Sequence, residues 1–160
     1  MGEKNEIEEV LSVLASAPER FEALLASVED ADSYESRGAD EWSPKRIFAH
    51  LRAANAILEP RIYFVLVRDN PPLVGYDDTV WLAVAHYDTL PTTELLESMR
   101  FHRNELIHTL RHVSPDDWQR TGTHEVRGPM TVLDIAHQII DHETDHLDQI
   151  KRSIGTQSGR

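Results

Sequence analysis

The segment MTVLDIAHQIIDHETDHLDQIKRS, residues 130–153, decides the fold because its apolar side chains recur with the period of an α-helix. On a helical wheel, at about 100° per residue, they gather on one side. They are Val132, Ile135, Ala136, Ile139, Leu147 and Ile150. The opposite side carries Asp134, His137, Asp141, Asp145 and Asp148. The segment therefore predicts an amphipathic last helix that packs on other helices and exposes an acidic, solvated face.

Two histidines of this helix, His142 and His146, lie on the flank of the apolar side. A spacing of four residues puts both rings on one face, about one turn apart. A buried imidazole must satisfy both ring nitrogens, since an unpaired buried polar group is costly. A divalent metal takes one ring nitrogen from each histidine and satisfies both at once. The pair therefore predicts metal ligation, and the alternative is a polar cleft lined by the two rings.

Periodic segments elsewhere in the chain predict further helices, separated by connections that contain Gly and Pro. They cover about residues 4–29, 43–68, 77–87 and 92–113. Ser43 followed by Pro44 is a strong helix start, and Thr92 or Thr93 is expected to cap the later helix. The pattern leaves open whether Pro18 and Pro60 kink their helices or split them.

The connections show no alternation typical of a β-strand. Residues 30–42 are expected to form a loop, and residues 114–129 a connection with one helical turn around residues 115–118. Four long helices joined by such connections predict an all-α fold. We expect an antiparallel four-helix bundle with short extra helices in the connections, formed by a single domain over residues 1–160.

Composition excludes several classes of partner. The formal net charge of −12 disfavours binding to nucleic acid or to an anionic membrane surface. No apolar run approaches the roughly 20 residues of a membrane span, and the polar N-terminal stretch lacks the apolar core of a secretory signal. Cysteine is absent, which removes disulfides and thiolate ligands. We expect a cytoplasmic protein that binds neither nucleic acid nor membrane.

Two further histidines face inward on the helical wheel. His50 lies at the edge of the apolar stripe through Ile47 and Ala54, and His102 lies on the stripe of the helix over residues 92–113. A lone inward histidine is more often a hydrogen-bonded core residue than a ligand. Helical geometry alone therefore supports His142 and His146 as a pair but does not attach a third ligand to them.

Residues 142–146, HETDH, also match the H-E-x-x-H pattern of zinc metalloproteases, in which the glutamate is the general base. Such proteases take a third ligand downstream, yet residues 147–160 contain neither His nor Glu. The predicted fold also offers no sheet edge to align a peptide. The context argues against a zinc protease. Glu143 points into the apolar stripe, where its carboxylate needs a specific partner and could orient a ligand or act as a base.

Several short motifs, spread along nearly the whole chain, carry a resemblance. They are Trp42-Ser43-Pro44 with His50-Leu51, the stretch DNPPLVGYD at residues 69–77, Trp118-Gln119-Arg120 with His124, Gly128 and Thr131-Val132, and His142, His146 and Gln149-Ile150. In this order they resemble the DinB/YfiT-like family of metalloenzymes. The resemblance implies an up-down-down-up bundle in which three histidines bind a divalent ion, often nickel or zinc. It assigns these ligands to His50, His142 and His146.

The resemblance also implies chemistry. Three protein ligands leave an open position, as in catalytic sites, and the ion lowers the pKa of a water or substrate thiol there. We therefore expect a metal-dependent hydrolase or a thiol-dependent S-transferase that acts on a small molecule, with Glu143 as a candidate catalytic residue. The alternative is a non-catalytic bundle that binds a small ligand or a protein partner. A homodimer is expected by analogy with related bundles.

Four residues are candidates for lining the cavity beside such an ion: Tyr76, Trp81, His102 and Arg103. For each of them, a plain core or surface position is the more common outcome.

Overall fold

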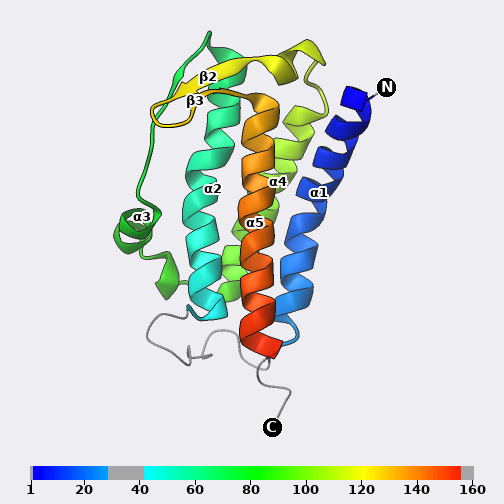
Figure 1. Cartoon of the computed structure of the whole chain (residues 1–160). Helices are drawn as coiled ribbons and strands as arrows, with labels where there is room; N and C mark the ends of the chain where they lie inside the picture. Colours follow the sequence, from blue (N-terminus) through cyan, green and yellow to red (C-terminus); the bar gives the residue numbers. More distant parts are fainter. Residues whose placement is uncertain (1, 29–41, 156–160) are drawn as a thin grey trace.

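Four long helices packed side by side form the computed structural model, which describes residues 2–28 and 42–155 (Figure 1). They are α1 (Gly2–Leu25), α2 (Pro44–Val67), α4 (Thr92–Leu110) and α5 (Val132–Gly155). Helices α1 and α5 run in one direction along the bundle, and α2 and α4 run in the other (Figure 1). The predicted all-α, up-down-down-up four-helix bundle is confirmed.

The connection between α2 and α4 makes these two helices parallel. It comprises β1 (Pro72–Leu73), α3 (Asp78–Ala85) and the 3-10 helix η1 (Tyr87–Thr89), and it returns along the outside of α2 (Figure 1). Helix α1 packs against α4 and α5, and α2 packs against the same two helices. Helices α1 and α2 therefore occupy opposite corners of the bundle, which leaves one side of α2 facing α3.

A small sheet covers one end of the bundle. It contains β1, β2 (Thr121–His124) and β3 (Gly128–Thr131); β1 runs parallel to β2, and β2 and β3 form an antiparallel hairpin. A Cβ on Gly122 would lie 2.9 Å from the Leu73 side chain, so only glycine allows β1 to approach this closely. The expectation that the chain contains no strand was wrong, because β1 and β2 lie about 50 positions apart and are too short to show alternation.

The observed starts of the helices agree in part with those predicted from the sequence. The Ser43 hydroxyl accepts a hydrogen bond from the Arg46 backbone at 3.2 Å, which confirms the predicted cap of α2. The cap predicted at Thr92 or Thr93 was wrong, because Pro91 holds that position without a side-chain hydrogen bond. The predicted helical turn near residue 116 is the 3-10 helix η2 (Asp116–Gln119). Most of the predicted loop, residues 30–41, lies outside the described residues.

Neither proline splits its helix, since α1 continues through Pro18 and α2 continues through Pro60. Proline has no N–H, so it frees the carbonyl four residues earlier in a helix. For Pro18 this is the carbonyl of Leu14, which accepts a hydrogen bond from Nη1 of Arg103 at 2.9 Å. A side chain from α4 thus replaces the missing backbone donor, and α1 stays continuous.

The core has two apolar parts separated by a polar layer. One part includes Leu58, Leu106, Ile135 and Ile139, and the other includes Phe21, Phe48, Leu51 and Leu147. Between them along α2, α4 and α5 lie the buried residues Asn55, Glu59, Arg103 and Glu143. Charges this deep must be paired, because an unpaired buried charge costs several kcal/mol.

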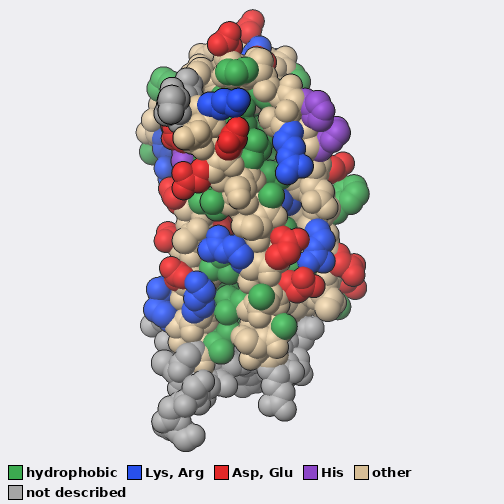
Figure 2. Space-filling model, turned by 90° about the vertical axis from the view of Figure 1, so that its right-hand side faces the viewer, with side chains coloured by type: hydrophobic (Ala, Val, Ile, Leu, Met, Phe, Trp, Pro, Cys, Tyr) green, Lys and Arg blue, Asp and Glu red, His purple; other side chains and the backbone are tan. Residues whose placement is uncertain are grey.

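The outer surface on the α1 side of the bundle intersperses charged side chains of both signs with small hydrophobic areas (Figure 2). Among the described helices, none combines the length and the apolarity needed to cross a bilayer.

Candidate metal centre

Three imidazole rings converge where the first half of α2 faces α5. The Nε2 atom of His142 lies 3.0 Å from Nε2 of His50 and 3.2 Å from Nε2 of His146. One ring nitrogen from each residue lies within 4.8 Å of the other two. His142 and His146 are neighbours because they are one turn apart on α5, whereas the packing of α2 on α5 adds His50. The structure therefore brings together the three histidines that the resemblance selected.

Two of the distances between the rings fit a shared divalent ion. Bonds of about 2.0–2.1 Å to nitrogen put two ligand atoms about 2.9 Å apart at a right angle and about 3.4 Å apart at a tetrahedral angle. Both short Nε2···Nε2 distances, 3.0 and 3.2 Å, fall in this interval. The residues present thus fit a metal ion, and His50, His142 and His146 could hold it through Nε2.

Hydrogen bonding sets the proton position on one of the rings. Nδ1 of His146 lies 2.8 Å from Oε1 of Gln149, and an amide oxygen only accepts, so Nδ1 donates. The Nε2 atom of neutral His146 then keeps its lone pair, and this atom faces His142. Among the described residues, Nδ1 of His50 and Nδ1 of His142 are buried without a hydrogen-bond partner. The hydrogen bond from Nδ1 of His146 makes Gln149 a residue that fixes the orientation of this candidate ligand.

The surroundings keep two of the rings neutral. Burial, followed by the neighbouring His146 ring, lowers the pKa of His50 to about 4, and Asp78 opposes this shift. Burial and then His146 also lower the pKa of His142. Neutral imidazole is the form that binds a metal ion. The cluster therefore presents these ligands in their binding form near neutral pH.

One carboxylate that the sequence analysis missed stands beside the cluster. Oδ2 of Asp78 lies 3.6 Å from Nε2 of His50, and the Asp78 side chain is 41% exposed. Asp78 begins α3, and the preceding residue Asp77 caps this helix by accepting hydrogen bonds from the backbone of Thr79 and Val80. The only feature of the sequence that pointed to Asp78 was its position at the start of a predicted short helix. Tertiary packing brings that helix to α2.

Glu143 points away from solvent and into the polar layer of the core. Its Oε1 accepts hydrogen bonds from Nη2 of Arg103 at 2.6 Å and from Nδ2 of Asn55 at 2.9 Å, and its Oε2 accepts from Nη1 of Arg103 at 3.1 Å. These are the specific partners that a carboxylate in the apolar stripe requires. They favour the role of orienting a ligand over that of a free base, and the catalytic role of Glu143 stays a prediction.

A family comparison agrees with the fold and the histidine cluster. The family model for the DinB superfamily matches residues 14–150. The chain belongs to the DinB superfamily. The resemblance inferred from the sequence motifs is thereby confirmed.

Relatives of this DinB-superfamily chain carry names that refer to metal-dependent hydrolysis. A protein of Halalkalibacterium halodurans named “Putative metal-dependent hydrolase” is 18% identical over 152 residues, which cover 95% of this chain and 88% of that protein. A protein of Oceanobacillus iheyensis with the same descriptive name is 18% identical over 154 residues, which cover 96% of this chain and 88% of that protein.

A solved structure is similar to this DinB-superfamily fold. It is YfiT from Bacillus subtilis, described as “a probable metal-dependent hydrolase with an unusual four-helix bundle topology”. The TM-score is 0.84 at 16% identity, and the match covers 96% of this chain and 87% of that one. At this identity the match supports the bundle fold and not the chemistry.

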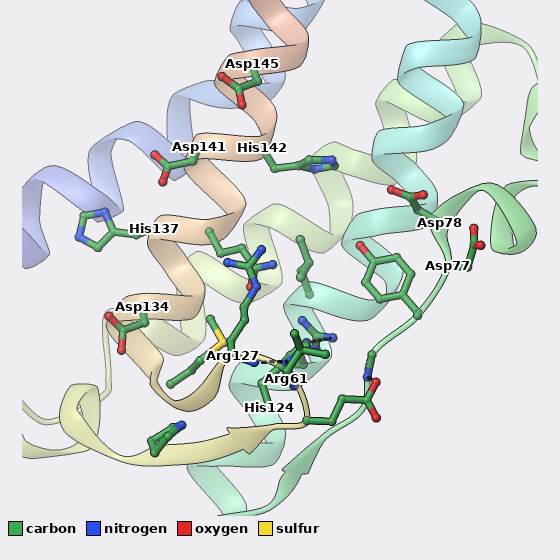
Figure 3. Close-up of a pocket in the computed structure, with 18 residues that line it drawn as sticks. Arg61, Asp77, Asp78, His124, Arg127, Asp134, His137, Asp141, His142 and Asp145 are labelled. Atoms are coloured by element: carbon green, nitrogen blue, oxygen red, sulfur yellow. Dashed lines mark hydrogen bonds between the residues drawn. The ribbon is translucent and has the colours of Figure 1, made fainter.

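A cavity of about 1170 Å³ opens beside His142 of the histidine cluster. At one end His142 from α5 and Asp78 from α3 point toward one another, and at the other end Arg61, His124 and Arg127 are grouped (Figure 3). A small molecule in this cavity can therefore reach the histidine cluster. The cavity lies between α5, the small sheet and the connection from β1 to α3.

Only one of the four residues considered for lining this cavity does so. Tyr76 lines it, and burial raises the pKa of its hydroxyl. Trp81 is 38% exposed and lines a separate hollow on α3. His102 makes a hydrogen bond through Nδ1 to the Ser98 carbonyl at 2.8 Å, and Arg103 is buried in the polar layer. The common core or surface outcome therefore holds for Trp81, His102 and Arg103.

Proposed function

We propose that this protein is a divalent-metal-dependent hydrolase acting on a small molecule, with its ion held by Nε2 of His50, His142 and His146. The observation that carries the proposal is the convergence of the three Nε2 atoms, with two of the separations at 3.0 and 3.2 Å. The hydrolase names of the curated relatives support the reaction class. Imidazole ligands suit nickel and zinc, which are therefore the first ions to test.

When bound, such an ion supplies a Lewis acid that polarises a carbonyl or phosphoryl oxygen and acidifies a water or thiol beside it. The protein's own residues do the rest. Gln149 holds the His146 ring through Nδ1, and the buried partners of Glu143 fix the turn of α5 that carries His142. Both contacts keep the ligand atoms in place before a substrate arrives.

Asp78 is the carboxylate best placed to move a proton. It lies at ion-pair distance from His50, lines the cavity and stays in contact with solvent. A carboxylate that water can reach can accept a proton from an attacking water and pass it to a leaving group. Glu143, by contrast, is buried, and its oxygens already accept hydrogen bonds from Arg103 and Asn55. We therefore assign proton transfer to Asp78 and ligand orientation to Glu143.

Metal analysis of the purified protein tests the centre. We expect about one equivalent of a divalent ion in the wild type, and loss of that ion in His50→Ala, His142→Ala and His146→Ala. The matched control removes His108, in the last turn of α4, and His112, in the turn that follows this helix; both are exposed, and their ring centroids lie 4.7 Å apart. Stoichiometric metal that survives the three single substitutions, or that disappears in the control, contradicts the proposed centre.

Activity assays then separate the reaction classes. Metal-loaded protein is assayed with ester, amide and phosphoester substrates, and in parallel with low-molecular-weight thiols and electrophiles. Turnover of the first group that requires His142 supports the hydrolase. Turnover that requires an added thiol instead indicates the thiol-dependent S-transferase expected as the alternative chemistry. Metal binding without turnover in either group favours the non-catalytic bundle.

The homodimer and the cytoplasmic location expected from the sequence stay predictions. Sedimentation analysis tests the first, and fractionation of cells that express the protein tests the second.

A further inference from the structure

Arg61 is a buried cation without an acidic partner among the described residues. Its side chain, on α2, is 4% exposed, and no carboxylate of the described chain lies within ion-pair distance of it. Nη2 donates to the Val74 carbonyl at 2.6 Å, but Nε and Nη1 are buried with no hydrogen-bond partner. Burial lowers the pKa of Arg61, which reflects the cost of holding this charge away from water. A guanidinium cannot escape that cost by losing its proton.

The contrast with Arg103 shows that the fold pairs its other buried arginine fully. Arg103 is 1% exposed, and its three nitrogens donate to Glu59, Glu143 and the Leu14 carbonyl. Glu125 is the carboxylate whose charge affects the pKa of Arg61, but its Oε1 accepts a hydrogen bond from the Gly75 backbone at 2.9 Å instead. Arg61 therefore lacks the anion that its position calls for.

His124 sharpens this conclusion because it also directs a donor toward Arg61. Nδ1 of His124 accepts hydrogen bonds from the backbone N–H groups of Val126 and Arg127, at 3.1 and 3.3 Å. A neutral ring that accepts at Nδ1 carries its proton on Nε2. This Nε2–H lies 3.4 Å from Nη2 of Arg61, which is also a donor. Two donors placed side by side cannot satisfy each other, but both can donate to one anionic oxygen.

We propose that Arg61 and His124 form a binding site for an oxyanion group, a carboxylate or a phosphate, at the end of the substrate remote from the histidine cluster. This inference rests on the proposed function, since it takes the cavity beside His142 as the place where substrate binds. Arg61, His124 and Arg127 all line that cavity and are grouped at one end of it (Figure 3). The exposed Arg127 adds positive charge at the same end.

Helix geometry sets the scale of the substrate. Arg61 follows His50 by 11 residues on α2, which is close to three full turns, so both side chains leave the same face of the helix. Their backbone positions are roughly 17 Å apart along the helix axis. Leu58, Met130 and Tyr76 also line the cavity. The site therefore suits an elongated molecule with an oxyanion at one end and an uncharged, partly apolar body.

The remaining charges of the cavity limit the substrate to one such group. They are carboxylates: Asp134, Asp141 and Asp145 stand along α5 (Figure 3), and Asp77, Asp78 and Glu125 line the cavity from other segments. They repel a second anion, and they also make nonspecific attraction of anions a poor explanation for binding, given the net charge of −12. Recognition must then come from direct contact with Arg61 and His124.

Equilibrium binding to the full chain tests the proposal without any need for turnover. The probes are 3-phenylpropionate, phenyl phosphate and the uncharged 3-phenylpropionamide, titrated by calorimetry into the metal-loaded wild type. We expect at least one oxyanion to bind at least about tenfold more tightly than the amide. The tighter of the two anions tells whether the natural group is a carboxylate or a phosphate.

Substitutions then assign the preference to residues. Arg61→Gln is expected to abolish the preference for the oxyanion over the amide. Arg52→Gln, on the same helix and outside the cavity, should leave this preference unchanged. If Arg61→Gln does not fold, His124→Asn takes its place. Asparagine retains an acceptor for the backbone of the turn but lacks the Nε2–H, and we expect it to weaken oxyanion binding by about tenfold.

The last variant separates this proposal from the metal centre. His142→Ala should lose the metal yet bind the oxyanion within about twofold of the wild type, because Arg61 and His124 remain in place. Equal binding of anion and amide to the wild type overturns the proposal, as does a preference that both Arg61→Gln and His124→Asn retain. If the metal analysis finds no bound ion but the wild type still prefers an oxyanion over the amide, and Arg61→Gln abolishes that preference, then the proposed function is overturned and the oxyanion site stands.

Discussion

The guanidinium of Arg103 donates hydrogen bonds to both carboxylate oxygens of Glu143, at 2.6 and 3.1 Å. Glu143 directly follows the candidate metal ligand His142 in the chain. The same guanidinium binds Glu59 and fills the hydrogen-bonding gap that Pro18 leaves at the Leu14 carbonyl. One side chain of α4 thus ties α1, α2 and α5 together next to the candidate metal ligands. The polar layer is therefore a structural support for the site.

Removal of Arg103 should be strongly destabilising. Arg103→Ala leaves Glu59 and Glu143 buried without their cation, and we expect the free energy of unfolding to fall by about 3–5 kcal/mol. The control is Arg100→Ala on the same helix, which breaks a more exposed ion pair with Glu22 and should cost less than about 1 kcal/mol. Chemical denaturation measures both variants, and equal costs would show that the network does not stabilise the fold.

Gln149 should control metal affinity without being a ligand. Gln149→Leu removes the acceptor for Nδ1–H of His146, and we expect the metal dissociation constant to rise by about 10- to 100-fold. Gln149→Glu keeps an acceptor and should retain tight binding. Competition with a metal-sensitive dye measures the constants. Unchanged affinity in Gln149→Leu would refute the orienting role.

Asp78 should affect turnover more than metal binding. Asp78→Asn keeps the size of the side chain but removes its capacity to accept a proton, so we expect kcat to fall by about 10²- to 10⁴-fold at unchanged metal content. Asp77→Asn is the matched neighbour, because asparagine also caps a helix and α3 should persist. The assay uses the substrate identified in the activity screen. An Asp78→Asn enzyme with normal kcat would exclude Asp78 as the proton carrier.

The buried histidines should make the metal-free protein sensitive to acid. The pKa of His50 is about 4 in the folded protein against 6.5 for an ordinary histidine. Between these pH values His50 is protonated in the unfolded chain but stays neutral in the folded chain. The free energy of unfolding therefore falls as the pH drops from about 6.5 to 4. His142, whose pKa is also lowered, acts in the same direction.

Denaturation at several pH values in the presence of a chelator measures this dependence. His50→Gln should flatten the loss of stability between pH 6.5 and 4, whereas His112→Gln, at an exposed position just after α4, should leave it as in the wild type. A slope that does not change in His50→Gln would mean that other groups cause the acid sensitivity.

Much of the fold was predictable because its signals are local. The 3.6-residue period, the Ser43-Pro44 start and the i, i+4 spacing of His142 and His146 act over one or two turns of helix, so they can be recognised without knowledge of the tertiary structure. The family motifs added His50. The strands escaped prediction because β1 and β2 pair across about 50 positions, and each is too short to show a period.

By itself, then, the sequence determined the amphipathic helices and the inward direction of the histidine pair, since each follows from side-chain order along one helix. Four such helices in one chain were enough to predict a bundle. Only the tertiary structure decided that Asp78 stands beside His50, that Arg103 replaces the donor missing at Pro18, and that Arg61 is buried without an anion. The physical reason is that these contacts join residues from different elements. Burial and charge pairing exist only once those elements pack against one another.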